Sequence, residues 1–252
     1  MLIGIVGHAG SGKDVVAGFM VERGFASIAL ADPMKAVCQD VFGWSKESLW
    51  GPSELRSMED KRSNVTICNH CGWFGQDTDL KYPYGEEGNG RCPRCQEWDN
   101  VKTLPLSPRI ALQILGTQFG RALYPDIWID LAIRRAKAIM DPLTKIGNVP
   151  FIDSVKWPED HKAECHGVAI SDVRFANEMT LIKENGGKLI HVTRPSADKG
   201  STGISGHASE TEQDTIPNEW YDLTLNNSGT IADLETHVDA LLNELHKGDS
   251  NA

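Results

Sequence analysis

The chain has 252 residues, 40% of them hydrophobic, and a net charge of −10 at pH 7. This composition is typical of a globular protein and excludes a chain that is disordered throughout. No apolar run approaches the ~18 residues that a membrane-spanning helix needs, and the N-terminus lacks the pattern of a signal peptide. We therefore expect a cytoplasmic protein that does not bind membranes. The acidic charge also disfavours general binding to nucleic acid, which needs clustered cations.

Short apolar strands and helices alternate along the chain. We expect strands at residues 2–6, 26–30, 167–171, 188–193 and 222–225. We expect helices at residues 13–23, 33–42, 54–62, 108–121, 126–140, 175–185 and from 230 onward, the last with an apolar face that includes Ile231. This alternation indicates an α/β fold, a parallel sheet with helices on both faces. Such sheets bind ligands at the carboxyl ends of their strands.

A glycine-rich turn follows the first strand and opens the first helix. Its residues have the G-x-x-x-x-G-K spacing of a Walker A loop, and they are Gly7, His8, Ala9, Gly10, Ser11, Gly12, Lys13 and Asp14. The glycines let successive N–H groups point at phosphate oxygens, and the helix N-terminus adds positive charge. We therefore expect a sheet of the P-loop NTPase type that binds ATP, with Lys13 at the terminal phosphates. Asp14 stands where Ser or Thr usually binds Mg²⁺, so we expect it to hold Mg²⁺ directly or through a water.

Charged side chains follow the next three strands. Asp32 and Lys35 come after the second strand, Asp172 and Arg174 after the third, and Arg194 after the fourth. Because these strand ends converge on the phosphate loop in a parallel sheet, we expect these side chains to line one site. Asp32 also fits a structural role, since it directly precedes a helix opened by proline and has the chemistry of an N-cap.

Several segments together resemble the bacteriophage deoxynucleoside monophosphate kinases. These segments are the phosphate loop, residues 29–35 (ALADPMK), 112–121 (LQILGTQFGR), 125–128 (PDIW) and 170–178 (ISDVRFANE), the Arg-Pro pair at 194–195, and His207-x-Ser209-Glu210. They occur in the same order as in that family. Together they span nearly the whole chain, apart from residues 65–100 and 141–166, which we expect to be an insert and a loop.

The resemblance implies transfer of the γ-phosphoryl group of ATP to a deoxynucleoside 5′-monophosphate, on a P-loop core related to adenylate kinase and dephospho-coenzyme A kinase. It also implies that Gln113, Arg121 and Trp128 face the monophosphate, with Arg174 close by. An arginine offers a planar fork to a phosphate. The candidate catalytic residues are Lys13, Asp32, Arg121 and Arg174. The candidate substrate-binding residues are Asp32, Lys35, Gln113, Arg121, Trp128, Asp172 and Arg174. Arg194 joins the phosphate loop as a candidate ATP-binding residue.

Residues 65–100 contain two C-x-x-C pairs, Cys68 with Cys71 and Cys92 with Cys95. This spacing predicts a structural zinc ribbon with four thiolate ligands. The segment carries three basic and six acidic side chains, which disfavours DNA binding. The ribbon lies between two acceptor-side helical regions, so we expect it either to brace the monophosphate-binding segment or to form a subunit contact in a homodimer.

The predicted organisation is a kinase core of residues 1–64 and 101–252, a zinc-ribbon insert of residues 65–100 and a lid loop of residues 195–217. A lid would exclude water, which otherwise hydrolyses ATP. Two alternatives to a deoxynucleotide kinase stay open. One is a dephospho-coenzyme A kinase or other small-molecule kinase on the same core. The other is an ATP-dependent binding module whose ribbon holds a nucleic acid or a protein, although such a module needs no phosphate-and-base pocket. A phage-encoded chain would act in the host cytoplasm.

Overall fold

The computed structural model describes residues 1–8, 10–76, 91–97, 100–144, 146–159, 165–195 and 212–249. The chain divides into two compact units. The first, here called the sheet unit, comprises Met1–Pro33, Asp126–Gly200 and Ala208–Ala252. The second, here called the cysteine unit, comprises Met34–Pro125 and Ser201–His207. No helix in the described part of the chain is long and apolar enough to cross a membrane.

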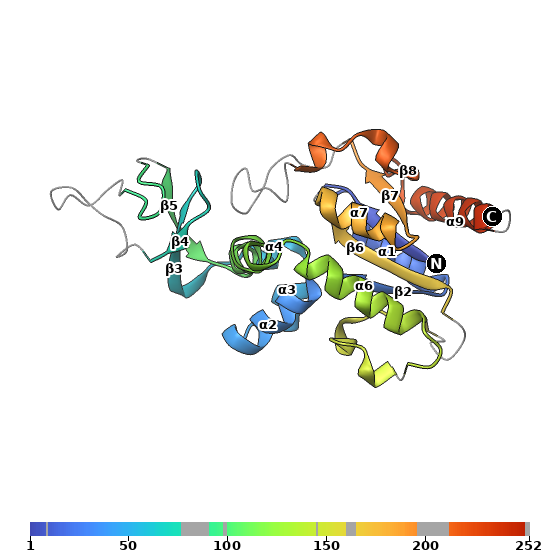
Figure 1. The fold of residues 1–252 in the computed structure, drawn as a ribbon, viewed down its shortest axis with the longest axis horizontal. Coiled ribbons are helices and arrows are strands. Elements are labelled where there is room, and N and C mark those ends of the chain that lie inside the picture. Colours follow the sequence, from blue (N-terminus) through green and yellow to red (C-terminus); the bar gives the residue numbers. More distant parts are fainter. Residues whose placement is uncertain are drawn as a thin grey trace. The chain divides into compact units, whose positions relative to one another are not determined.

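A five-stranded parallel sheet forms the centre of the sheet unit (Figure 1). Its strands, in the order β2-β6-β1-β7-β8 across the sheet, are β1 (Leu2–Val6), β2 (Phe25–Ala29), β6 (Gly167–Val173), β7 (Lys188–Thr193) and β8 (Leu223–Asn226). Every residue of β1 is buried, as expected for a central strand with helices on both faces. The chain therefore leaves β1 in the middle of the carboxyl edge of the sheet.

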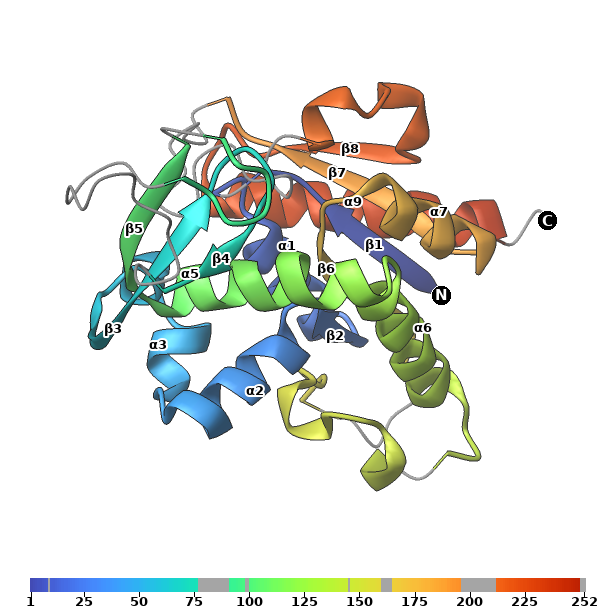
Figure 2. The same ribbon diagram turned by 60° about the vertical axis from the view of Figure 1, so that its left-hand side comes forward.

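Helices cover both faces of this sheet. On one face, α6 (Ile127–Met140) and α7 (Ala176–Glu184) bury apolar side chains against the strands. On the other face, α1 (Lys13–Glu22) and α9 (Ile231–Asp249) pack on the strands and on each other. Figure 2 shows α7 and α9 on opposite sides of the strands. The two apolar layers confirm the predicted α/β fold with a parallel sheet between helices.

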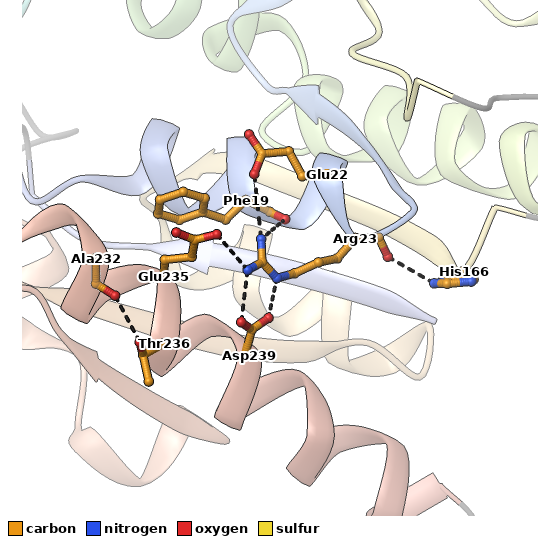
Figure 3. A network of polar contacts seen from close by, with 8 residues as sticks. All are labelled: Phe19, Glu22, Arg23, His166, Ala232, Glu235, Thr236 and Asp239. Carbon is orange, nitrogen blue, oxygen red and sulfur yellow. Dashed lines mark hydrogen bonds and ion pairs between the residues drawn. The ribbon is translucent and has the colours of Figure 1, made fainter.

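A cluster of ion pairs joins the end of α1 to α9 (Figure 3). Arg23 donates to the carboxylates of Glu235 at 3.0 Å and Asp239 at 2.9 Å, and to the carbonyl oxygen of Phe19 at 3.1 Å. The hydrogen bond from Arg23 lowers the pKa of Asp239. Because both carboxylates are about half exposed, solvent screens these pairs and their contribution to stability is small.

The cysteine unit contains several helices and a three-stranded antiparallel sheet of order β4-β3-β5. Its helices are α2 (Asp32–Phe42, whose first two residues belong to the sheet unit), α3 (Lys46–Trp50), α4 (Ser53–Arg56) and α5 (Pro108–Gln113). Its strands are β3 (Asp60–Cys68), β4 (Phe74–Gly75) and β5 (Val101–Leu106). A π-helix, Ile114–Arg121, follows α5 directly, and the two form one continuous coil (Figure 2). The unit has two small apolar clusters, one of Val65, Ile67, Ile110 and Ile114 and one of Cys38, Leu49 and Ala111.

The predicted helix at residues 54–62 is wrong. Helix α4 ends at Arg56, and β3 begins at Asp60 and pairs with β5. The strand forms because its second half is buried against a partner far along the chain, a non-local pairing that overrides the local polar pattern. The antiparallel sheet therefore extends beyond residues 65–100 at both ends.

Smaller differences concern single residues and helix type. Asp32 is the first residue of α2 rather than its N-cap, and its Oδ2 atom accepts the N–H of Ala29 at 3.0 Å. The helix predicted at residues 108–121 divides into α5 and the π-helix. Ile231 is 71% exposed, so it does not belong to the apolar face of α9.

The two predicted loops contain short 3₁₀ turns where they are described. In residues 141–166 the turns are Ile146–Asn148 and Ile152–Ser154. Residues 196–211 of the predicted lid, with His207, Ser209 and Glu210, lie outside the described residues. The turns Glu212–Thr215 and Asn218–Trp220 follow that segment.

Candidate active site

The turn between β1 and α1 has the backbone of a phosphate loop. Gly7, Gly10 and Gly12 have positive φ angles of 151°, 77° and 98°, which residues with side chains rarely adopt. A Cβ atom on Gly12 would also collide with the Nδ2 atom of Asn227, and one on Gly7 with the carbonyl oxygen of Val192. The glycines therefore let the loop curl tightly against the end of β7 and the segment after β8.

Two polar side chains are buried inside this loop. Lys13 is 6% exposed, and its Nζ atom donates to the carbonyl oxygens of Gly7 at 2.6 Å and His8 at 2.7 Å. The Oγ atom of Ser11 is buried and has no hydrogen-bond partner among the described residues. Buried polar atoms normally have a partner, so an unpartnered hydroxyl beside an ammonium and a helix N-terminus fits a bound phosphate. The loop thus fits the phosphates of a nucleotide.

A bulge in β6 places two of the predicted residues next to the loop. One residue of β1 lies opposite two residues of β6 at this point, and Asp172 has a positive φ of 64°. Bulges re-aim side chains near functional sites, and strained backbone concentrates there. Arg174 Nη2 lies 4.0 Å from Asp172 Oδ1. The buried carboxylate of Glu178 accepts the backbone N–H of Arg174 at 2.8 Å, which fixes the start of α7 behind the pair.

Helix α6 supplies a buried charge that the sequence analysis missed. Arg135 is 1% exposed, and its Nη2 atom donates to Phe151 O at 3.2 Å and Ser154 Oγ at 2.9 Å. Burial lowers the pKa of Arg135, and the attraction of Asp32 opposes this effect. Asp32 is itself 3% exposed. A signal was present in the sequence, because Arg135 lies three residues after Ala132 on the face of α6 that packs into the core.

A cavity of about 200 Å³ lies beside the loop. Its lining residues are His8, Ser11, His191, Val192, Thr193, Arg194 and Pro195. The ring of His191, on β7, stacks on Tyr221 with the centroids 4.2 Å apart. Burial lowers the pKa of His191, and the charges of His8 and Lys13 lower it further. The cavity therefore combines a histidine that disfavours its charged form with the exposed guanidinium of Arg194.

Four cysteine side chains meet in the cysteine unit, as the sequence predicts. The Sγ atoms of Cys68, Cys71, Cys92 and Cys95 all lie within 4.8 Å of one another. Two of the pairs, Cys68–Cys95 and Cys71–Cys92, are 3.7 Å and 3.6 Å apart. Sulfur atoms arranged tetrahedrally at about 2.3 Å from Zn²⁺ would be about 3.8 Å apart. The cluster therefore has the donor set and spacing of a structural zinc site. No second group of three or more potential ligands is present in the described part of the chain.

The two C-x-x-C segments have the same backbone. The N–H of Gly72 donates to Cys68 O at 2.9 Å and the N–H of Gln96 to Cys92 O at 3.0 Å, with positive φ angles of 70° and 64°. Burial raises the pKa of both first thiols, whereas the backbone N–H groups two and three residues later lower it. Hydrogen bonds with the Cys95 and Cys68 thiols also lower the pKa of Cys92, which falls to about 7, whereas the pKa of Cys68 is raised overall. Such N–H groups stabilise the thiolate, which is the form that binds metal.

The chain is similar to a viral protein over almost its whole length. A protein of Acanthamoeba polyphaga mimivirus named "Putative deoxynucleotide monophosphate kinase" is 30% identical over 241 residues, which cover 94% of each chain. The chain belongs to the deoxynucleotide monophosphate kinase family. Among solved structures, a dephospho-CoA kinase from Campylobacter jejuni matches 98% of both chains with 15% identity and a TM-score of 0.37. No family model matches the sequence.

The sheet unit holds most of the predicted site residues. The phosphate loop follows β1, although Ala9 lies outside the described residues. Asp32, Asp172 and Arg194 lie at the carboxyl ends of β2, β6 and β7, which are neighbours of β1 or of each other, as predicted for one edge of a parallel sheet. Asp14 is exposed in the first turn of α1.

The remaining predicted residues lie on four helices. Trp128 is half-buried near the start of α6 and packs against the core of the sheet unit. Lys35, Gln113 and Arg121 belong to the cysteine unit. The Nζ atom of Lys35 lies 5.7 Å from the centroid of the Trp50 ring, and Arg121 ends the π-helix.

Proposed function

We propose that the protein transfers the γ-phosphoryl group of ATP to a deoxynucleoside 5′-monophosphate and releases ADP and a deoxynucleoside diphosphate. The observation that carries the proposal is the phosphate loop, with its buried Lys13 and a Ser11 hydroxyl that has no partner among the described residues. A relative named for deoxynucleotide monophosphates over 94% of the chain supports the choice of acceptor. An oxygen of the monophosphate forms a bond to the γ-phosphorus, and the bond from that phosphorus to the β,γ-bridging oxygen breaks.

The reaction needs alignment and charge neutralisation rather than a strong base, because a monophosphate is already ionised at neutral pH. In this proposal Lys13 leaves its two carbonyl partners and neutralises the transferring phosphoryl group, while the loop N–H groups hold the ATP phosphates. Arg194 adds a second cation on the ATP side. On the acceptor side, Arg121 and Arg174 bind the monophosphate. Further acceptor-side contacts come from Asp32, Lys35, Gln113, Trp128 and Asp172.

Mg²⁺ is part of the proposal, and the residues present fit it. When bound, Mg²⁺ neutralises charge on the β- and γ-phosphates. It keeps several waters and needs only one or two protein carboxylates, so the single exposed carboxylate of Asp14 in the first turn of α1 is sufficient. The usual Ser or Thr hydroxyl at this position ligates the ion directly. The longer Asp14 side chain can reach it directly or through a water.

We also propose that the four cysteines hold one zinc ion, which has a structural role because four thiolates leave no open position for substrate. The distances between the Sγ atoms and the matching backbone of the two C-x-x-C segments support this. A homodimer contact through the insert stays a prediction. The use of ATP supports a cytoplasmic location.

A coupled assay of ADP release tests the proposed function. The purified protein is supplied with ATP, Mg²⁺ and, one at a time, each deoxy- and ribonucleoside monophosphate and dephospho-coenzyme A. We expect turnover with at least one deoxynucleoside monophosphate to exceed the ATPase rate without acceptor by a factor of at least ten. Turnover with dephospho-coenzyme A alone, or ADP release that no acceptor changes, would overturn the proposal.

A further inference from the structure

The π-helix Ile114–Arg121 is the least ordinary element of the fold. π-helices are rare, occur mostly as single-turn bulges inside α-helices and are frequent at functional sites. This one is eight residues long. It carries Arg121 in its last turn, and its glycines Gly116 and Gly120 are buried. A Cβ atom on Gly116 would lie 3.0 Å from the Sδ atom of Met34, so α2 packs closely on this coil. Such a conformation persists only when its neighbours hold it.

The antiparallel sheet packs against the start of the π-helix. Val65 and Ile67 of β3 form one apolar cluster with Ile110 of α5 and Ile114, the first residue of the π-helix, and Leu104 of β5 packs against it. Strand β5 leads directly into the helix, because the Ser107 hydroxyl accepts the N–H of Ile110 at 3.4 Å and caps α5. The sheet therefore fixes where the coil begins and which face it buries.

The cysteine cluster begins at the last residue of the same strand and touches the same coil. Cys68 directly follows Ile67 and is the last residue of β3. The Cβ position of Gly72, in the first C-x-x-C turn, lies 3.8 Å from the Cγ atom of Gln118, in the middle of the π-helix. The Oε1 atom of Gln118 is buried and has no hydrogen-bond partner among the described residues. The first turn of the cluster is thus packed directly on the coil.

This sheet has little else to stabilise it. Its apolar cluster contains four buried residues, and β4 contains two residues in all. Small segments with so little core depend on a metal for their fold. Loss of the metal would leave the end of β3 unanchored at Cys68. The packing of Ile67 and the contact between Gly72 and Gln118 would then be lost.

We propose that zinc bound by the four cysteines positions the π-helix and therefore sets the affinity for the monophosphate acceptor, while ATP binding at the phosphate loop is independent of it. The cysteines act as positioning residues and do not touch the substrate. The role assigned to Arg121 rests on the proposed function. The mechanical part, that zinc holds the π-helix, rests only on the contacts above.

The test compares holoprotein, protein treated with a zinc chelator, and chelated protein to which zinc is returned. Hydrogen–deuterium exchange is measured on peptides from residues 108–125 and from α1. Steady-state kinetics use the deoxynucleoside monophosphate with the highest turnover, and ATP binding is measured by calorimetry. We expect zinc removal to raise exchange in residues 114–121 but not in α1. The KM for the monophosphate should rise at least tenfold, whereas the Kd for ATP should change less than twofold. Added zinc should return both the KM and the exchange in residues 114–121 to the values of the holoprotein.

Two variants distinguish the effect of zinc binding by the four cysteines from the effect of apolar packing on the π-helix. Val65→Ala keeps all four thiols and weakens the packing on Ile114, so we expect unchanged zinc content and a smaller rise in exchange and in KM. Cys165→Ser removes a thiol outside the cluster and should behave as wild type.

Unchanged exchange in residues 114–121 after zinc removal would overturn the proposal. So would an equal rise in α1 with loss of ATP binding, because zinc would then stabilise the whole chain. If the holoprotein phosphorylates no monophosphate, the proposed function fails, and the exchange data still decide whether zinc holds the π-helix.

Discussion

The sheet unit and the cysteine unit are stabilised by different means. In the sheet unit, two continuous apolar clusters cover both faces of five strands, and the phosphate loop is anchored between the ends of these strands. The cysteine unit has two apolar clusters, of four and three buried residues, a small antiparallel sheet and a group of four thiols that begins at the end of β3. The first unit has the core of an independent domain, whereas we expect the second to depend on the zinc proposed for its four cysteines. ATP binding and acceptor binding should therefore respond differently to metal, mutation and pH.

The largest expected effect is that of Lys13→Ala. Loss of the ammonium at the transferring phosphoryl group should lower kcat at least about 10³-fold, which is typical for a group that stabilises charge in the transition state. The circular dichroism spectrum should not change, because the sheet below the loop keeps its core. Lys137→Ala, an exposed lysine on α6 of the same unit, is the matched control. A folded Lys13→Ala variant with near-normal turnover would contradict the assignment of the loop.

Zinc content and protease resistance provide the next test. Metal analysis of purified protein should give one zinc per chain, and Cys71→Ser should lose most of it. Limited proteolysis after chelation should cut first within residues 60–106, and fragments of the sheet unit should stay resistant. Cys38→Ser, at a thiol buried away from the cluster, should retain its zinc. Protein that holds no zinc, or equally rapid cleavage of both units, would remove the distinction between them.

Arg121→Ala should affect the acceptor and spare ATP. A charge-assisted hydrogen bond contributes about 1.5–3 kcal/mol, so the KM for the monophosphate should rise about 10- to 100-fold while the Kd for ATP stays the same. Arg134→Ala is the control, since Arg134 is exposed and pairs with Asp130 on the same helix at 3.4 Å. Equal loss of both substrates would point to a folding defect rather than to acceptor binding.

The stability of the sheet unit should fall in mild acid because of His191. Burial lowers the pKa of this histidine in the folded protein, so the unfolded chain binds the proton more readily. The contribution of the neutral His191 to the free energy of unfolding is therefore fully present above the unfolded pKa of about 6.5. It is lost as the pH falls below that value, with a slope of at most about 1.4 kcal/mol per pH unit. Denaturant titrations from pH 7.5 to 5.5 should show a shallower slope for His191→Phe than for wild type. Equal slopes would show that His191 does not drive the effect.

The smallest effect should come from the ion pairs between α1 and α9. Asp239→Asn removes one partner of Arg23 at an exposed position, so Tm should fall by no more than a few degrees. The pKa of Asp239 is lowered in the folded protein. Its contribution is therefore present above the unfolded pKa of about 3.9 and is lost as the pH falls further. Calorimetry should show a larger difference between variant and wild type at pH 7 than at pH 3. Glu244→Gln, exposed on the same helix, should show none.

The sheet unit was largely predictable because its signals are local. Apolar runs mark its strands, and the spacing from Gly7 to Lys13 marks the loop. The bulge at Asp172 was not predictable, since a positive φ on a residue other than glycine depends on the strand beside it. Arg135 was overlooked because a charge buried on an apolar helix face requires partners from distant segments, here Phe151, Ser154 and Asp32.

In the cysteine unit, the four thiols and the helices α2 and α5 were predictable, whereas the antiparallel sheet and the π-helix were not. The spacing of the thiols indicates a metal site without reference to the rest of the fold. Strands β3 and β5 pair across the whole insert, so the polar start of β3 was mistaken for a helix. The π-helix was not predictable because its sequence, ILGTQFGR, has the apolar pattern of an ordinary helix and differs only in what packs around it.

Transfer of labelled phosphate tests the central claim most directly. The holoprotein is incubated with Mg²⁺, ATP labelled at the γ-phosphate and each deoxynucleoside monophosphate, and the products are separated by chromatography. We expect the label in a deoxynucleoside diphosphate, in a one-to-one ratio with the ADP formed, and no transfer by Lys13→Ala. Label that appears only as inorganic phosphate, or that reaches no deoxynucleoside monophosphate, would contradict the claim that this chain is a deoxynucleotide kinase.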